Sequence, residues 1–288
     1  MIEGVFEKLL YSLHQMGREQ SGDAWESEIS TSLEMLREEY EQLTVENRGE
    51  IDYANLSTQT AYVYAYAIGR AEFTYQLLKR YRAKLGQPIF RNKEARITSL
   101  GGGPGSEIAG VVKYLLDSAS GEKVESIKYW VFDKDGDWAH PCQALVDELS
   151  AFIPIDIVFD TLDLCDQNAC KNISLEGDDL LMLSFVISEV CTVEKSSDVL
   201  ESLRGLYKTM DSGSRIFYND SNASSFYYFF NASRKFVKGL GRSSEVSEIK
   251  DKISMSLKFG LTYQEFNDEF GSTPHLTSDA LSKLLVRL

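Results

Sequence analysis

The sequence predicts an α/β fold, in which a mainly parallel sheet carries helices on both faces and follows a helical segment. Two observations predict it. From about residue 96 onward, short apolar runs typical of strands alternate with helical stretches, the pattern of a covered parallel sheet. Before that point, apolar residues recur at steps of three and four residues, as on one face of a helix. We therefore expect a helical cap or lid over residues 1–95 and a sheet domain over residues 96–288.

The helical segment is expected to hold two long helices. Apolar residues line one face from about Asp23 to Leu43. Ser57 or Thr58 can cap a second helix, which ends at residues 86–88. This second helix is rich in tyrosine and phenylalanine, which more often pack a helix onto its domain than cover a ligand. We predict a packing role for these rings.

The sheet domain is expected to contain strands joined by helices. The predicted strands cover residues 97–100, 127–132, 155–159, 180–185 and 215–218. Helices are expected at 106–117 and 141–152, and the tail offers residues 253–259 and 284–288 as sixth and seventh strands. Open parallel sheets bind ligands at the carboxyl ends of their strands. The residues just after each strand are therefore the candidate site residues.

Composition sets the expected surroundings. The sequence shows neither an apolar run of roughly 20 residues nor a basic and apolar leader. We expect a soluble protein with no membrane partner and an intracellular, cytoplasmic location, with the nucleus as an alternative. Four cysteines are too few for a disulfide scaffold. Because the three histidines lie far apart and Cys165 and Cys170 lack a second ligand pair, no metal site is predicted.

The charge is strongly acidic but unevenly distributed. A formal net charge of −14 argues against a surface that grips phosphate backbones throughout. Residues 69–96 are locally basic, with eight Lys and Arg against two Glu. We expect a solvated helix face beside an acidic neighbour. A polyanionic substrate stays open as the alternative.

A glycine loop is the most informative motif. It follows the first predicted strand and opens a helix, so a ligand can lie on bare backbone at a helix N-terminus. The dinucleotide-binding fingerprint is G-x-G-x-x-G, but this loop has Ser106 at the sixth position. The Gly-Lys-Ser/Thr ending of a Walker loop is also absent. We expect a nucleotide-like ligand. The loop residues are Gly101, Gly102, Gly103, Pro104 and Gly105.

This loop, placed after a strand, resembles the first motif of class I S-adenosylmethionine (SAM) dependent methyltransferases, and the resemblance runs from about Arg96 to the C-terminus. It implies a Rossmann-like, seven-stranded mixed sheet and SAM as the cofactor bound by the loop. Members of the family commonly carry an acid two residues before the first glycine, where this chain has Ser99. Glu107, in the first turn of the following helix, is the candidate replacement.

The resemblance assigns further cofactor contacts. Asp133 ends the second strand, where a carboxylate can accept hydrogen bonds from both ribose hydroxyls. Asp135 is the alternative. Lys134 adjoins this position. Asp163 matches the acid beside the adenine amino group better than Asp160, and Leu164 or Trp138 could pack on the adenine ring. Ser184 and Phe185 match the motif that faces the methyl group and the acceptor.

The methyl acceptor is not visible in the sequence. Glu189 and Asp220 follow strands whose ends face the ligand, so they are the candidate general bases, with His140 as a weaker third. An RNA base methyltransferase is one alternative, on a loose likeness to fungal enzymes that modify uridines in ribosomal RNA. A non-catalytic SAM sensor or scaffold and a nicotinamide-dependent oxidoreductase are others. The acceptor class is left as small molecule, protein or RNA.

Overall fold

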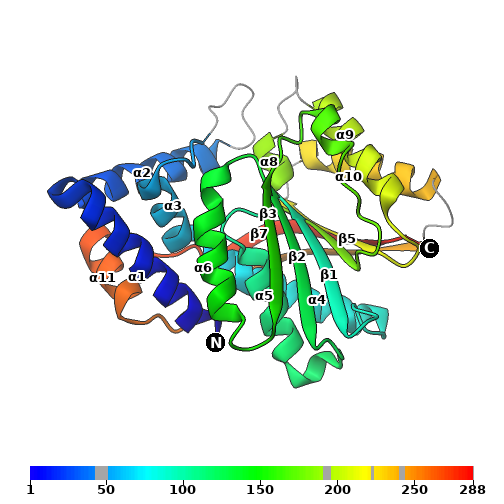
Figure 1. The fold of residues 1–288 in the computed structure, drawn as a ribbon, viewed down its shortest axis with the longest axis horizontal. Coiled ribbons are helices and arrows are strands. Elements are labelled where there is room, and N and C mark those ends of the chain that lie inside the picture. Colours follow the sequence, from blue (N-terminus) through cyan, green and yellow to red (C-terminus); the bar gives the residue numbers. More distant parts are fainter. Residues whose placement is uncertain (43–50, 191–195, 222–223, 240–243, 288) are drawn as a thin grey trace.

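A seven-stranded sheet forms the centre of the molecule (Figure 1). The computed structural model describes residues 1–42, 51–190, 196–221, 224–239 and 244–287. The strand order is β3-β2-β1-β4-β5-β7-β6. Strand β7 runs antiparallel to β5 and β6, and the other pairs are parallel. The predicted seven-stranded mixed sheet is confirmed. The strands are β1 (Glu94–Leu100), β2 (Ser126–Asp133), β3 (Ile155–Thr161), β4 (Leu180–Ser184), β5 (Arg215–Ser221), β6 (Ser244–Ser254) and β7 (Thr277–Val286).

Helices cover both faces of this sheet because its strands are apolar on both sides. In β4, Leu180 and Met182 belong to one hydrophobic cluster while Leu181 and Leu183 belong to another, as the two-residue period of a strand requires. One cluster packs under α4 (Ile68–Leu85), α5 and α6, and the other under α9 and α10. These helices and the short ones beside them are α5 (Ser106–Leu116), α6 (Ala139–Leu149), α7 (Gln167–Cys170), α8 (Val186–Val190), α9 (Ser196–Thr209) and α10 (Ser224–Gly239).

The helical segment shares its core with the sheet. Phe6 and Leu10 of α1 and Ile68 of α4 are fully buried in the same cluster as Ile97 of β1 and Val112 of α5. Helix α11 packs against α1, and α1, α2, α3 and α11 lie to one side of the sheet beside α6, whereas α4 packs on a face of the sheet next to α5 (Figure 1). The elements of the helical segment are α1 (Ile2–Ser21), α2 (Trp25–Glu41), α3 (Leu56–Tyr62), a π-helical turn (Val63–Ala67) and α4 (Ile68–Leu85), with α11 (Leu261–Phe270) added from the tail.

Several boundaries differ from those predicted. Helix α1 lies outside both predicted long helices, and the second of these is interrupted by the π-helical turn. The predicted first helix matches α2, and Leu43 at its expected end lies outside the described residues. The predicted sixth strand, 253–259, overlaps β6 only at its first two residues, since β6 is Ser244–Ser254, a charged edge strand with few apolar residues. Strand β7 begins seven residues before the predicted 284. Within the described residues, no helix is long and apolar enough to cross a membrane.

Candidate functional site

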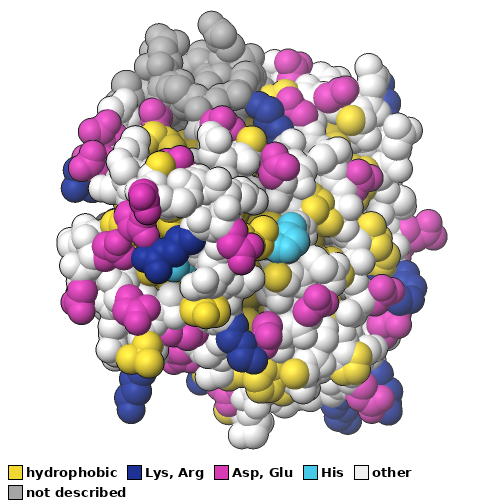
Figure 2. All heavy atoms as spheres, turned by 60° about the vertical axis from the view of Figure 1, so that its left-hand side comes forward, with side chains coloured by type: hydrophobic (Ala, Val, Ile, Leu, Met, Phe, Trp, Pro, Cys, Tyr) yellow, Lys and Arg dark blue, Asp and Glu magenta, His cyan; other side chains and the backbone are white. Residues whose placement is uncertain are grey.

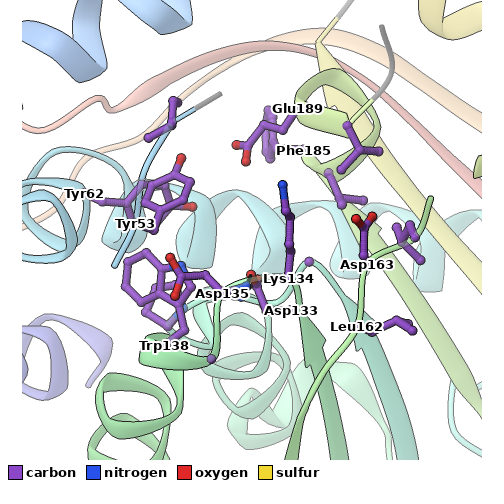
Figure 3. Close-up of a pocket in the computed structure, with 18 of the residues that line it drawn as sticks. Tyr53, Tyr62, Asp133, Lys134, Asp135, Trp138, Leu162, Asp163, Phe185 and Glu189 are labelled. Atoms are coloured by element: carbon purple, nitrogen blue, oxygen red, sulfur yellow. Dashed lines mark hydrogen bonds between the residues drawn. The ribbon is translucent and has the colours of Figure 1, made fainter. Parts of the chain in front are cut away.

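A cavity of about 480 Å³ opens at the carboxyl ends of β1, β2, β3 and β4 (Figure 3). This is where an open parallel sheet is expected to bind its ligand. One side of the cavity comes from the sheet and its loops, and the other side comes from residues before the first strand. Its lining includes Asp52, Tyr53, Tyr62, Arg70, Gly101, Gly103, Pro104, Asp133, Lys134, Asp135, Trp138, Leu162, Asp163, Leu164, Ser184, Phe185 and Glu189.

The glycine loop forms part of the sheet side. Gly101, Gly103 and Gly105 have φ values of 66°, 46° and 84°, a region that glycine enters without strain. The Gly101 amide donates to the Phe132 carbonyl at 2.7 Å, which holds the loop against the end of β2. Gly101, Gly103 and Pro104 line the cavity. Gly102 instead faces inward, where an added Cβ would lie 2.7 Å from Val131, and Gly105 is buried against Cys142.

Asp133 lies at the foot of this loop. Its Oδ2 accepts from the Gly103 amide at 2.8 Å and its Oδ1 from the Asp135 amide at 3.0 Å. These bonds fix the carboxylate while leaving further lone pairs for a ligand. Burial raises the pKa of Asp133 to about 6, since the two amide bonds only partly offset the loss of water. A cation or a pair of hydroxyl groups in the cavity would stabilise the charged form.

The adenine candidates lie on two different sides. Asp163 and Leu164 follow β3, and the Asp163 carboxylate accepts from the Cys165 amide at 2.8 Å. Trp138 lies across the cavity from Asp163, beside Tyr53 and Tyr62 (Figure 3). Of Leu164 and Trp138, the two residues predicted to pack on the adenine ring, only Leu164 therefore lies next to Asp163.

Two residues at the end of β4 show features typical of a ligand site. Ser184 is buried, and its Oγ has no hydrogen-bond partner among the described residues. A buried hydroxyl of this kind is costly unless a ligand or water satisfies it. Phe185 follows with φ of 59°, the only positive value for a residue other than glycine in the described chain, and its amide donates to the Asn219 carbonyl at 2.7 Å. Backbone strain of this kind concentrates at functional sites.

Besides Gly102 and Gly105, three predicted residues do not line the cavity. Glu107 is buried within α5, where burial raises the pKa of its carboxyl to about 7. Asp220 is fully buried, and its carboxylate accepts from the Ser188 amide of α8 at 2.9 Å. His140 is exposed on α6. Ser99 is buried and accepts a hydrogen bond from the Tyr129 hydroxyl at 3.1 Å. The expected replacement of the family's acid by Glu107 therefore has no support from its position.

Glu189 lies in the cavity within a network that the sequence did not reveal. Its Oε1 accepts from the Tyr40 hydroxyl at 2.8 Å, and the Tyr40 and Tyr53 hydroxyls lie 2.9 Å apart. Arg70 approaches the same carboxylate at 3.7 Å and donates to the Tyr62 hydroxyl at 2.7 Å. Burial raises the pKa of the Tyr40 and Tyr53 hydroxyls well above the usual range, so both stay protonated.

Arg70 is surrounded by aromatic rings. Its guanidinium carbon lies 4.4 Å from the centre of the Phe185 ring, 5.1 Å from Tyr62, 5.3 Å from Tyr40 and 5.9 Å from Tyr66. Contacts of this kind stabilise a desolvated cation. The four-residue spacing of Tyr62, Tyr66 and Arg70 is the sequence signal that they share a helix face. Nothing local indicates that this face meets Glu189.

The cavity lining is predominantly acidic. It contains the carboxylates of Asp52, Asp133, Asp135, Asp163 and Glu189 against the cations Arg70 and Lys134. Lys134 extends across the middle of the cavity toward Glu189 (Figure 3). Such a lining favours a ligand with net positive charge over a diphosphate. The described residues contain no group of three or more His, Cys, Asp and Glu side chains placed to hold a metal ion.

The basic stretch 69–96 is engaged within the molecule. Lys79 pairs with Asp117 at 2.8 Å, Lys93 with Glu125 at 2.6 Å, and Arg82 donates to the Ser120 carbonyl. The remaining cations of the stretch, Arg70, Arg80, Lys84, Arg91 and Arg96, also have partners. On the face drawn in Figure 2, Asp and Glu side chains are spread among Lys and Arg. The stretch therefore fits the expected basic face beside acidic neighbours better than a phosphate-binding patch.

No family model and no curated protein matches the sequence, whereas solved structures are similar in fold. One is an O-methyltransferase family protein from Burkholderia thailandensis, with 11% identity and a TM-score of 0.47 over 96% of this chain and 82% of that chain. Another is precorrin-6y C5,15-methyltransferase from Geobacter metallireducens GS-15, with 9% identity and a TM-score of 0.40 over 74% and 89%. A third is the N-methyltransferase NodS from Bradyrhizobium japonicum WM9 in complex with S-adenosyl-l-homocysteine, with 10% identity and a TM-score of 0.42 over 74% and 85%.

Proposed function

We propose that this chain is a SAM-dependent methyltransferase. The observation that carries the proposal is the lining of the main cavity, in which a positive-φ glycine loop and Asp133 meet at the carboxyl ends of β1 and β2. The lining fits SAM, which is a net cation with a ribose diol. The lining holds five carboxylates and two cations, which suits the positively charged sulfonium. The Ser184 Oγ, which has no hydrogen-bond partner among the described residues, offers the ligand a polar contact. The volume of about 480 Å³ lies within the range for small-molecule sites.

The cofactor would be held from three strand ends. Asp133 would accept hydrogen bonds from the ribose hydroxyls, Asp163 would accept one from the adenine amino group, and Leu164 would pack on the adenine ring. Gly101 and Gly103 let the ligand lie against backbone. When bound, SAM supplies an activated methyl group on sulfur, so the chain's main task is to align an acceptor and exclude water.

Glu189 is the proposed general base. It lies at the end of the cavity near Phe185 (Figure 3), and the Tyr40 hydroxyl orients its carboxylate. An acceptor hydroxyl or amine in hydrogen-bond reach of Glu189 would lose its proton there. Asp220 is better suited to holding the α8 backbone, because its carboxylate is buried on the Ser188 amide.

Calorimetric titration tests this proposal. SAM and its product S-adenosylhomocysteine should bind the full chain with one site each, while NADH should not bind. Asp133→Asn should weaken SAM about tenfold through the lost charge-assisted hydrogen bond. The matched control is Asp137→Asn, which changes an exposed carboxylate in the 3-10 turn Gly136–Trp138, outside the cavity lining. Binding of NADH without SAM would replace the methyltransferase with the oxidoreductase alternative.

A non-catalytic SAM-binding protein is the second candidate. One observation favours it: neither Ser99 nor Glu107 supplies a carboxylate to the cavity at the position where the family commonly has one. Transfer of labelled methyl from SAM into RNA, protein or metabolite fractions separates the two. Incorporation into any fraction identifies an enzyme and its acceptor class, whereas SAM binding without incorporation supports a sensor or scaffold.

A further inference from the structure

A second cavity of about 280 Å³ lies against the first, on the other side of Arg70 and Phe185, which line both. It is built between α2, α4 and the chain on either side of α11. No predicted cofactor contact except Phe185 lines it. The remaining lining residues are Arg37, Tyr40, Glu41, Tyr66, Gly69, Phe73, Met255, His275 and Thr277.

The second cavity has an apolar interior and a polar mouth. Phe73 and Met255 are buried, whereas Arg37, His275 and Thr277 are exposed. The rings of Tyr66 and His275 stack with centres 4.6 Å apart and an interplanar angle of 8°. The His275 segment is fastened to the helix by a bond from its amide to the Ala65 carbonyl at 2.7 Å. A Cβ at Gly69 would clash with the His275 carbonyl, so glycine permits this close approach.

We propose that the second cavity binds the methyl acceptor, and that the acceptor is a planar aromatic molecule of about two fused rings carrying a hydroxyl or amine. The proposal rests on the proposed function. An apolar cavity of about 150 Å³ is large enough for benzene, so about 280 Å³ suits a second ring. The tyrosine, phenylalanine and histidine rings of the lining favour a flat aromatic ligand. Arg37 and Glu41 at the mouth balance one another in charge, and Arg70 is paired with Glu189, so the ligand needs no net charge.

Arg70 and Phe185 separate the two cavities, so the reacting end of the acceptor would have to reach past them to Glu189 in the first cavity. Phe185 holds a strained backbone conformation there, and its ring lies 6.3 Å from Phe73 and 4.4 Å from the Arg70 guanidinium. Arg70 and Tyr40 line the second cavity and also contact Glu189. The acceptor oxygen or nitrogen would form a bond to the methyl carbon, the sulfur–methyl bond would break with its electron pair staying on sulfur, and the proton would go to Glu189.

Binding of 2-naphthol to the full chain tests this assignment. It is titrated by calorimetry in the presence of saturating S-adenosylhomocysteine, and the saturated analogue decahydro-2-naphthol serves as the control ligand of similar size. We expect 2-naphthol to bind whether or not S-adenosylhomocysteine is present, and to bind at least tenfold more tightly than the saturated analogue. Thr277→Trp, at the exposed mouth, should weaken 2-naphthol at least tenfold, while Thr273→Trp, exposed and outside the cavity, should not.

Equal binding of 2-naphthol to the wild type and Thr277→Trp would overturn the proposal, as would displacement by S-adenosylhomocysteine or no binding of 2-naphthol. The proposed function is tested separately, by measuring S-adenosylhomocysteine binding in the same samples. Both tryptophan variants should retain that binding. If S-adenosylhomocysteine fails to bind while Thr277→Trp still weakens 2-naphthol, the methyltransferase and the acceptor role are both wrong and only an aromatic site stands.

Discussion

The two sides of the main cavity are built by different means. The sheet side uses backbone: three positive-φ glycines, amides that hold Asp133, and short loops at strand ends. The helical side uses long side chains from far along the sequence, with the Tyr40 hydroxyl reaching Glu189 across 149 positions. A backbone site suits the parts of a ligand that do not vary, whereas a side-chain site can change by single substitutions. We infer that the sheet side recognises the cofactor and that the helical side governs the acceptor.

The largest expected effect is on the sheet side. Gly103→Val should abolish SAM binding, at least about 100-fold, because a branched side chain would project into the cavity from a residue with φ of 46°. The nearest neighbour, Trp138, is 3.8 Å from the added Cβ, so there is room for the side chain, but valine at a positive φ strains the loop and should also lower the stability. Calorimetry gives the affinity and thermal unfolding gives the stability. Retained SAM affinity in a folded variant would contradict the position assigned to the cofactor.

On the helical side, Arg70→Met should mainly affect stability. The side chains of Arg70 and Glu189 are 12% and 25% exposed, so removing one partner should cost about 2 kcal/mol, less than for a fully buried pair. The double variant Arg70→Met with Glu189→Gln should recover part of that loss, because no unpaired charge is left. Chemical denaturation of the three variants forms a double-mutant cycle. Additive losses would mean that the two groups do not interact.

Acid should weaken SAM binding through Asp133. Its pKa of about 6 in the free protein means that protonation competes with a cationic ligand below that pH. Affinity should therefore rise about tenfold from pH 5 to pH 7 and then level off, and Asp133→Asn should flatten that rise. Because the folded pKa is raised above the unfolded value, Asp133 contributes stability below about pH 4 that is lost as the pH rises through about 6. A SAM affinity that falls over this range would count against Asp133 as the ribose contact.

The smallest expected effect comes from Tyr53→Phe. This change removes one hydroxyl bond, to Tyr40, while keeping the ring packed on Tyr62 and Trp138. Stability should fall by about 1 kcal/mol, and SAM affinity should stay within a factor of about two, because the hydroxyl belongs to the helical side. A larger loss of SAM affinity than of stability would move Tyr53 into the cofactor site.

The sheet side was largely predictable because its signals are local. Five apolar runs gave the positions of β1 to β5, and a glycine loop after β1 located Gly101, Gly103 and Asp133 at the cavity. Strand β6 was missed because a charged edge strand has no apolar run to detect. Glu107 and Asp220 looked suitable by position along the chain, but their side chains point into packed interior rather than into the cavity.

The helical side could not be predicted for a physical reason. The sequence pattern places Tyr62 and Arg70 on an amphipathic, aromatic helix, and packing was the correct prediction for Tyr64 and Tyr81, which are buried and line neither cavity. Whether one face of that helix meets Glu189 depends on how the helix packs on the sheet, and that is set by contacts such as those of Gly110 with Ala71 and Thr74. No local pattern encodes those contacts.

A crystal structure of the full chain with S-adenosylhomocysteine tests the central claim most directly. We predict the adenosyl group in the main cavity, with both ribose hydroxyls about 2.7 to 3.0 Å from the Asp133 carboxylate and the sulfur facing Phe185 and Glu189. A ligand bound elsewhere, or a ribose held by other residues with Asp133 turned away, would contradict the account.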